Sequence, residues 1–189
     1  MNRFRVVFDA CVLYPAAVRD LLMELAVAGL YKSHWSDEIH DEWIRNVLDN
    51  RPDLTAERLA NTRRHMDAYS QDALVDGYQY LIPTIELPDA DDRHVVAAAL
   101  HCRADAIITF NLKDFPREVM DALGLEAIHP DDFVTYQFDL DAPRTCESAK
   151  RVRSRLANPP YSPEEYVSHL RKSGLPRTAD RYADWLALL

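Results

Sequence analysis

Acidic and amide side chains follow two hydrophobic segments of this chain directly. Asp9 comes immediately after the apolar run FRVVF, and Asn111 and Asp114 lie in the sequence TFNLKDF, where the run AIITF ends. A further acid, Asp92, stands just before the alanine-rich run VVAAALHC. A carboxylate in such a place could accept a phosphoryl group, bind a metal ion or cap a helix. The sequence around these residues is needed to distinguish between these three roles.

Those segments alternate between strands and helices. The predicted strands are short and apolar, and they span residues 4–8, 31–35, 106–110 and 125–129. Helical patterns lie between them at residues 16–29, after the N-cap Ser36, at residues 55–74 and in the run VVAAALHC. Apolar strands of this kind require a sheet that is covered on both faces. The alternation through residues 4–135 therefore predicts the α/β class, with a doubly wound, mainly parallel sheet flanked by helices.

The C-terminal part of the chain has helical patterns and no strand pattern. One predicted helix ends at Pro159, a second begins with Ser162 as its cap and Pro163 in its first turn, and a final helix covers PRTADRYADWLALL. Some fifty residues are too few to be stable alone. We predict a first domain at residues 1–137 and an all-helical extension at residues 138–189.

Composition excludes several classes of protein. The four glycines form no phosphate-binding loop, which argues against dinucleotide and nucleoside triphosphate binding. The three cysteines form no C-x-x-C pair, so we expect reduced thiols rather than a zinc site. Without an apolar run long enough for a signal peptide or membrane helix, we expect a cytoplasmic protein. The net charge of −9 means that any nucleic acid must be attracted by a local basic cluster.

The acids are expected to converge at one edge of the sheet. Functional groups collect at the carboxyl ends of parallel strands, and Glu42 lies one turn into the helix that follows the second strand. Two carboxylates about 4 Å apart repel by roughly 4 kcal/mol at a protein surface, so such a group must take up protons or bind a cation. Oxygen ligands without Cys or His suit Mg²⁺ or Mn²⁺, which could promote phosphodiester cleavage.

Each acid also has an ordinary structural interpretation. Asp9 could cap the helix that begins after Pro15, although a cap would lie closer to that helix, and we favour a functional role. Glu38 competes with Glu42 on the same helix face, and Asp92 could cap its helix and still bind a ligand. Other classes fit less well: an aspartyl phosphatase would need a second Asp at position 11, and the acids are placed wrongly for a response-regulator receiver.

Four segments together resemble the PIN-domain nucleases, in particular the VapC-like toxins of bacterial toxin–antitoxin pairs. They are VVFDACVLYPA, SDEIHDEW, LPDADDRHVVAAALHCRADAIITFNLKDFP and LGLEAIHPDDF, in order over residues 4–135. The helical tail resembles an extension found in one subgroup. The resemblance implies a PIN-like fold, Mg²⁺ or Mn²⁺ in an acid pocket, and cleavage of RNA.

The resemblance also implies roles for individual residues. The implied catalytic residues are Asp9, Glu42, Asp92, Asn111 and Asp114. Asp9, Asp92 and Glu42 would hold the ion, with Thr109 orienting the acids and Asp89 in support. The chain departs from the family pattern at Asn111, where many members have Asp, and at Cys11, which is often Asn.

We therefore predict a metal-dependent endoribonuclease that is the toxin of a type II toxin–antitoxin system. A protein antitoxin would cover the acid pocket, and a homodimer is a candidate assembly. A basic run could bind RNA or could be an ordinary solvated helix face: it consists of Arg144, Lys150, Arg151, Arg153 and Arg155. The alternative function is a catalytically weak PIN-like protein that acts mainly as a protein- or RNA-binding module.

Overall fold

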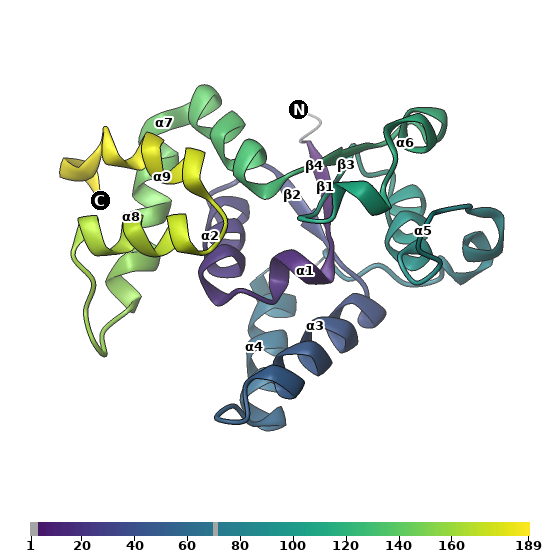
Figure 1. The fold of residues 1–189 in the computed structure, drawn as a ribbon, viewed down its shortest axis with the longest axis horizontal. Coiled ribbons are helices and arrows are strands. Elements are labelled where there is room, and N and C mark those ends of the chain that lie inside the picture. The colour runs from purple at the N-terminus through teal and green to yellow at the C-terminus, as the bar shows by residue number, and fades with distance from the viewer. Residues whose placement is uncertain (1–3, 70–71) are drawn as a thin grey trace. The chain divides into compact units, whose positions relative to one another are not determined.

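Four short strands form one parallel sheet in the order β2-β1-β3-β4. The computed structural model describes residues 4–69 and 72–189. The strands are β1 (Arg5–Phe8), β2 (Lys32–His34), β3 (Ala106–Ile108) and β4 (Glu126–Ile128) (Figure 1). All three pairings are parallel, and Val7 of β1 lies opposite His34 on one side and Ile107 on the other. The predicted α/β class and the four predicted strands are confirmed.

The strand order creates a topological switch point between β1 and β3. The chain leaves β1 to form β2 on one side and then returns to form β3 on the other. In open parallel sheets, ligands bind outside the carboxyl ends of the strands at such a point. Asp9 follows β1 and Thr109 follows β3, so both residues lie at this position.

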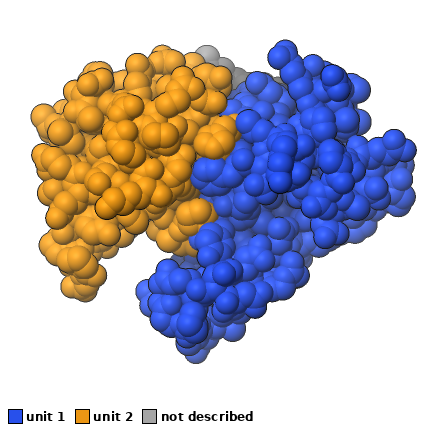
Figure 2. Space-filling model, viewed as in Figure 1, with its two compact units in different colours: residues 1–14, 31–128 blue, residues 15–30, 129–189 orange. Residues whose placement is uncertain are grey.

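The chain divides into two compact units. Unit 1 consists of Met1–Tyr14 and Tyr31–Ile128, and unit 2 of Pro15–Leu30 and His129–Leu189 (Figure 2). The domain boundary predicted at residues 137/138 falls within a helix of unit 2 and stays a prediction. Among the described helices, none is both long and apolar enough to cross a membrane.

Unit 1 surrounds its sheet with helices. They are α1 (Ala10–Leu13), α3 (Asp37–Asn50), α4 (Ala56–Tyr69), α5 (Arg93–Cys102) and α6 (Arg117–Leu123), with the 3-10 turns η1 (Gln79–Thr84) and η2 (Leu112–Asp114). α5 packs against β1 and β3, and its residues 95–99 are fully buried. Three alanines in that stretch let the helix lie close to the sheet. The helix predicted at residues 55–74 corresponds to α4, but the prediction was too long: residues 72–74 are not helical, because Leu74 forms a bridge with Trp35 instead, and residues 70–71 lie outside the described residues.

Helix α3 is held at both its start and its middle. Ser36 caps it as predicted, because its hydroxyl accepts a hydrogen bond from the Ile39 amide at 3.2 Å. The buried His40 accepts a bond at Nδ1 from the Trp43 indole at 2.9 Å, and its Nε2 lies 3.1 Å from the Asp67 carboxylate on α4. Since Nδ1 is an acceptor, Nε2 carries the hydrogen and donates to Asp67. This network ties α3, which carries Glu42, to α4.

Unit 2 consists of helices joined by loops, with no strand among its described residues. Its elements are α2 (Ala16–Val27), α7 (Pro130–Arg155), α8 (Pro163–Lys172), α9 (Pro176–Ala183) and the 3-10 turn η3 (Leu186–Leu188). α2 packs against α7 and α8, and α9 packs against α7 and α8. The buried Glu24 on α2 forms an ion pair with Arg155 on α7 at 2.7 Å.

Two helices of unit 2 differ from the sequence prediction. The predicted helix that ends at Pro159 corresponds to the second half of α7, which begins at Pro130 and continues across a kink at Asp141. Asp141 has non-helical φ and ψ of −158° and 80°, and its carboxylate accepts a hydrogen bond from the Arg144 amide at 3.0 Å. The final helix ends at Ala183 instead of continuing to Leu189, because Trp185 leaves the helical conformation before η3.

Ser162→Ala is expected to lower the free energy of unfolding by about 1 kcal/mol. Ser162 and Glu165 form a reciprocal capping box at the start of α8: the Ser162 hydroxyl accepts from the Glu165 amide at 3.2 Å, and the Glu165 carboxylate accepts from the Ser162 amide at 2.8 Å. Urea unfolding would measure the loss. Ser168→Ala, at an exposed position of the same helix, is the control and should change stability little. Equal effects of the two substitutions would contradict the capping role.

Candidate metal and catalytic site

Asp9 is a buried carboxylate with defined hydrogen-bond donors. It is 2% exposed, and its backbone amide continues the sheet by donating to the Ile108 carbonyl at 3.1 Å. The one-turn helix α1 begins at the next residue, yet the Asp9 side chain makes no capping hydrogen bond to it. Instead, Asp9 Oδ2 accepts from the Thr109 hydroxyl at 2.6 Å and from the Cys11 thiol at 3.0 Å. The helix that begins after Pro15 is α2, and its N-cap residue is Pro15 itself, so Asp9 does not cap that helix.

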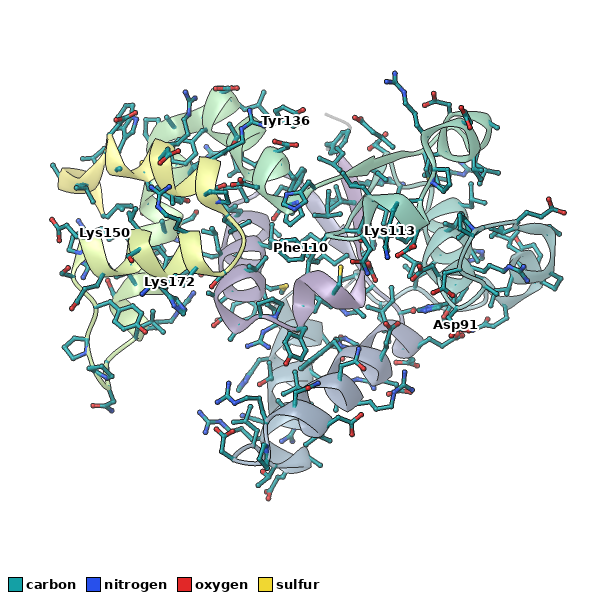
Figure 3. The ribbon with its side chains drawn as sticks, in the orientation of Figure 1. Asp91, Phe110, Lys113, Tyr136, Lys150 and Lys172 are labelled. Atoms are coloured by element: carbon teal, nitrogen blue, oxygen red, sulfur yellow. The ribbon has the colours of Figure 1, made fainter. Side chains whose placement is uncertain are left out.

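Hydrogen bonds connect the segment after β3 to the segment after β1. The Thr109 hydroxyl, which donates to Asp9, accepts from the Asn111 amide at 2.9 Å. The Cys11 sulfur accepts from the Phe110 amide at 3.2 Å. Figure 3 shows Phe110 and Lys113 on this segment. The three bonds fix the loop that carries Asn111 against Asp9, as expected for a residue at the Thr109 position that orients an acid.

Glu42 joins this group from α3. Its carboxylate lies 3.4 Å from His94 Nε2 on α5, and its charge raises the pKa of Asp9, although burial is the larger cause of that rise. The competing Glu38 has a different partner, because the Tyr78 hydroxyl donates to it at 2.8 Å. Glu42, rather than Glu38, is thus the acid of α3 whose charge acts on Asp9.

The environment of Asp92 gives the most direct indication that the acids converge. It occupies the N-cap position of α5, but its side chain makes no capping hydrogen bond. Burial, followed by the charges of Asp9, Asp89, Asp114 and Glu42, raises its pKa from 3.8 to about 7. Acids from four separate segments therefore lie within electrostatic range of one another.

Two predicted site residues contribute less directly. Asn111 has an exposed side chain, and its known contact with the group is made by its backbone amide. Asp89 is exposed, and its carboxylate accepts from the Asp91 amide at 2.9 Å in the turn before α5, where Figure 3 labels Asp91. Asp89 still adds negative charge near Asp92.

Comparison with known proteins places this geometry in a family. A family model described as "PIN domain" matches residues 5–113, which is more than half of the chain and contains Asp9, Glu42, Asp92 and Asn111. The chain belongs to the PIN-domain family. A second family model, "VapC50 C-terminal domain", matches residues 130–184. The family suggested by the sequence motifs is confirmed.

A curated relative of this PIN-domain protein comes from Mycobacterium tuberculosis (strain ATCC 25618 / H37Rv). It is named "Putative ribonuclease VapC50" and is 36% identical over 98 residues, which are 52% of this chain and 57% of the relative. The match thus spans little more than half of the relative's length. No solved structure matches the chain significantly.

Two residues that sequence reasoning did not assign to the candidate site, Cys11 and His94, contact its acids in the structure. Burial and the charge of Asp9 raise the pKa of the Cys11 thiol well above its ordinary value, so it stays protonated and donates to Asp9. Cys11 could have been found from its spacing, two residues after the first acid. His94 could have been found from its place two residues after Asp92 on the same helix, although nothing in the sequence pairs it with Glu42.

The donor set of the PIN site fits a hard divalent cation. Its acids offer carboxylate oxygens, and their mutual repulsion favours a positive charge among them. The acids lie within electrostatic range rather than at ligand distances: over residues 4–69 and 72–189, no three His, Cys, Asp or Glu side chains form a preassembled metal site. The fit therefore rests on the chemistry of the donors and on the raised pKa of Asp92.

The basic run on α7 is largely engaged within unit 2. Arg155 and Arg151 pair with the buried Glu24, and Arg144 pairs with Asp141. Arg153 donates to the carbonyls of Tyr161 and Leu189. Lys150, labelled in Figure 3, is exposed and has no ion pair among the described residues. These contacts favour a structural role for most of the run.

Asp92→Asn is expected to stabilise the metal-free protein at pH 8 by about 1 kcal/mol, the scale of one repulsive pair at contact distance in water. Asp92 ionises near pH 3.8 when unfolded and near pH 7 when folded, so the folded chain binds more protons between these values and wild-type stability falls as pH rises. The gain should therefore grow from about pH 4 to about pH 7 and then level off.

Urea unfolding in EDTA at several pH values would measure this gain. Asp121→Asn, at an exposed position on α6, is the matched control and should show no such dependence on pH. A destabilised Asp92→Asn protein at pH 8 would contradict the repulsion.

Proposed function

We propose that this PIN-domain protein is a metal-dependent endoribonuclease that hydrolyses RNA phosphodiester bonds. The observation that carries the proposal is the convergence of acids around Asp92 at the switch point of the sheet. The name of the relative, a ribonuclease, supports RNA as the substrate. A group of mutually repelling carboxylates around the buried Asp9 has a stability cost that a purely structural protein would have little reason to retain.

Asp9, Asp92 and Glu42 would hold a Mg²⁺ or Mn²⁺ ion, with Asn111 and Asp114 beside them. When bound, such an ion lowers the pKa of water and neutralises charge on the reacting phosphate. The protein's own residues do the positioning. Thr109 and Cys11 both donate to Asp9 Oδ2, so the orientation of this carboxylate is set before any ligand arrives.

Glu42 is the residue that we propose acts on the attacking water. Its side chain is 31% exposed, and it has a partner on another helix, His94. In this place it can orient a water molecule and accept its proton. Asp114, also half-buried, adds negative charge that favours the cation.

RNA must approach a unit of high negative charge. The segments of unit 1 contain 12 Lys and Arg against 20 Asp and Glu, a net charge of −8, which is nearly all of the chain's −9. Bound cations and local basic residues must offset this charge. Lys113, exposed and adjacent to Asp114, and Lys150 are the cations we propose for this purpose; the arginines of the basic run stay weaker candidates.

We further propose that the protein is the toxin of a type II toxin–antitoxin system. The support is the match of residues 130–184 to the VapC50 C-terminal domain and the 36% identity over 98 residues to the relative named VapC50. A protein antitoxin would cover the acid pocket by placing a basic side chain among the carboxylates. The alternative, a catalytically weak PIN protein that binds RNA or protein, is favoured by the exposed amide of Asn111 at the fourth acid position.

Removal of metal should abolish cleavage of RNA. Purified protein would be incubated with a pool of structured RNAs in Mg²⁺, in Mn²⁺ and in EDTA, and products would be separated by gel electrophoresis. We expect endonucleolytic products in either metal and none in EDTA, with activity restored when metal is added back. Cleavage that persists in EDTA would contradict metal dependence. Metal and RNA binding without any cleavage would support the binding-module alternative.

A further inference from the structure

His94 is the one partner that the described structure gives to Glu42. His94 Nε2 lies 3.4 Å from Glu42 Oε2, and the two side chains are 12% and 31% exposed. His94 is on α5, two residues after Asp92, whereas Glu42 is on α3. The contact therefore joins the two helices that supply the second and third acids of the proposed site.

Glu42 needs such a partner because its surroundings repel it. Its charge raises the pKa of both Asp9 and Asp92, which means that the three carboxylates act on one another unfavourably. A half-exposed glutamate has several rotatable bonds and could turn toward water to escape this repulsion. A hydrogen-bond donor on the neighbouring helix would keep the carboxylate within the group.

The environment of His94 suits this task. Its second nitrogen, Nδ1, is buried without a hydrogen-bond partner among the described residues. The contact with Glu42 is thus the polar interaction that orients the ring, and an Nε2–H can donate to the carboxylate whether the ring is neutral or charged.

We propose that His94 is a positioning residue that holds Glu42 among the acids of the site. The inference rests on the proposed function and deepens it, since His94 would act only through Glu42. Partners of this kind commonly change metal affinity or activity 10- to 100-fold when removed. If His94 served only to pack α5 against α3, its replacement would lower the stability of the protein instead.

The test compares His94→Leu with His94→Gln, whose amide nitrogen can reach about the position of Nε2. His94→Leu should lower kcat for RNA cleavage about 10-fold or more with a small change in KM, and should weaken Mn²⁺ binding in calorimetry by a similar factor. His94→Gln should recover most of both. His101→Leu and His101→Gln, at an exposed position of the same helix, are the matched controls and should behave like wild type.

A double-mutant cycle with Glu42→Gln gives the decisive comparison. Once Glu42 has lost its charge, His94→Leu should cause little further loss of kcat or Mn²⁺ affinity. Losses that simply multiply, equal losses in the Leu and Gln variants, or an unaffected Leu variant with normal urea stability would overturn the proposal. Wild-type protein that binds Mn²⁺ but cleaves no RNA would contradict the proposed function, while the Mn²⁺ affinities of the variants would still decide the role of His94.

Discussion

Asp9→Asn is expected to slow RNA cleavage on the order of 100-fold or more while leaving the fold intact. The amide is nearly the same shape as the carboxylate, but it is uncharged and a poorer ligand for a divalent ion. Asp9 is also the acid that Thr109 and Cys11 hold in place, so no other carboxylate of the group can take over its position. Initial rates of cleavage at saturating RNA and fixed Mg²⁺ would measure the effect.

Asp121→Asn is the matched control for this experiment. Asp121 is exposed on α6 and pairs with Arg117 at 3.5 Å, and it belongs to the same unit without acting on Asp92. The Asp121→Asn protein should cleave RNA at the wild-type rate. The circular dichroism spectrum and the urea midpoint of Asp9→Asn should stay at or above wild-type values, since a buried charge has been removed. An Asp9→Asn protein with full activity would refute the proposed role of Asp9.

Asp131→Ala is expected to lower the free energy of unfolding by about 2–3 kcal/mol. Asp131 is 3% exposed at the start of α7, where its two carboxylate oxygens accept from the Thr178 amide at 2.7 Å and the Arg177 amide at 2.9 Å. These amides belong to the first turn of α9, and Leu175 at its N-cap provides no side-chain acceptor. Removal of Asp131 would leave buried donors without partners. Urea unfolding would measure the loss.

Asp132→Ala tests whether the burial of Asp131 is the reason for its large expected contribution to stability. Asp132 is adjacent, but it is half-buried and pairs with the exposed guanidinium of Arg177. A surface ion pair of this kind contributes less than about 1 kcal/mol. The two substitutions should therefore differ clearly in urea, and similar losses would show that Asp131 does not cap α9.

The sheet and the edge at which the acids meet could be predicted from the sequence because both depend on local patterns. A strand buried on both faces is a continuous apolar run, as in FRVVF and AIITF, and helix starts carry caps such as Ser36 and Ser162. Once the sheet is parallel, the carboxyl ends of its strands share one edge, so the convergence of Asp9 and Asp92 follows.

The rest of the fold depends on contacts between distant residues, which a local pattern does not contain. The apolar stripe of residues 16–29 predicts a helix, but it does not say that α2 packs against α7 rather than against the sheet. The sequence prediction contains no helix at residues 130–140, whereas α7 begins at Pro130. The structure accommodates Pro143 by a kink at Asp141.

The same limit applies within the site. Cys11 looked like a departure from the family pattern, yet its thiol supplies a hydrogen bond to Asp9. The sequence motifs give His94 no role, and only the folded chain brings this residue of α5 within 3.4 Å of Glu42 on α3. Residue type indicated the ligands of the proposed site, whereas the residues that hold those ligands could be identified only from the folded chain.

The interrupted sequence of unit 2 has a consequence for how the protein is made. α2 leaves the ribosome early, but α7, the helix on which it packs, is synthesised only after the whole of residues 31–128. At about 5–20 residues per second, translation of that segment takes on the order of 5–20 s. During this interval the buried leucines of α2, Leu21, Leu22 and Leu25, lack the helix on which α2 packs in the finished protein. The nascent chain must therefore carry an uncovered apolar helix for most of its synthesis, which makes this helix a natural target for chaperones.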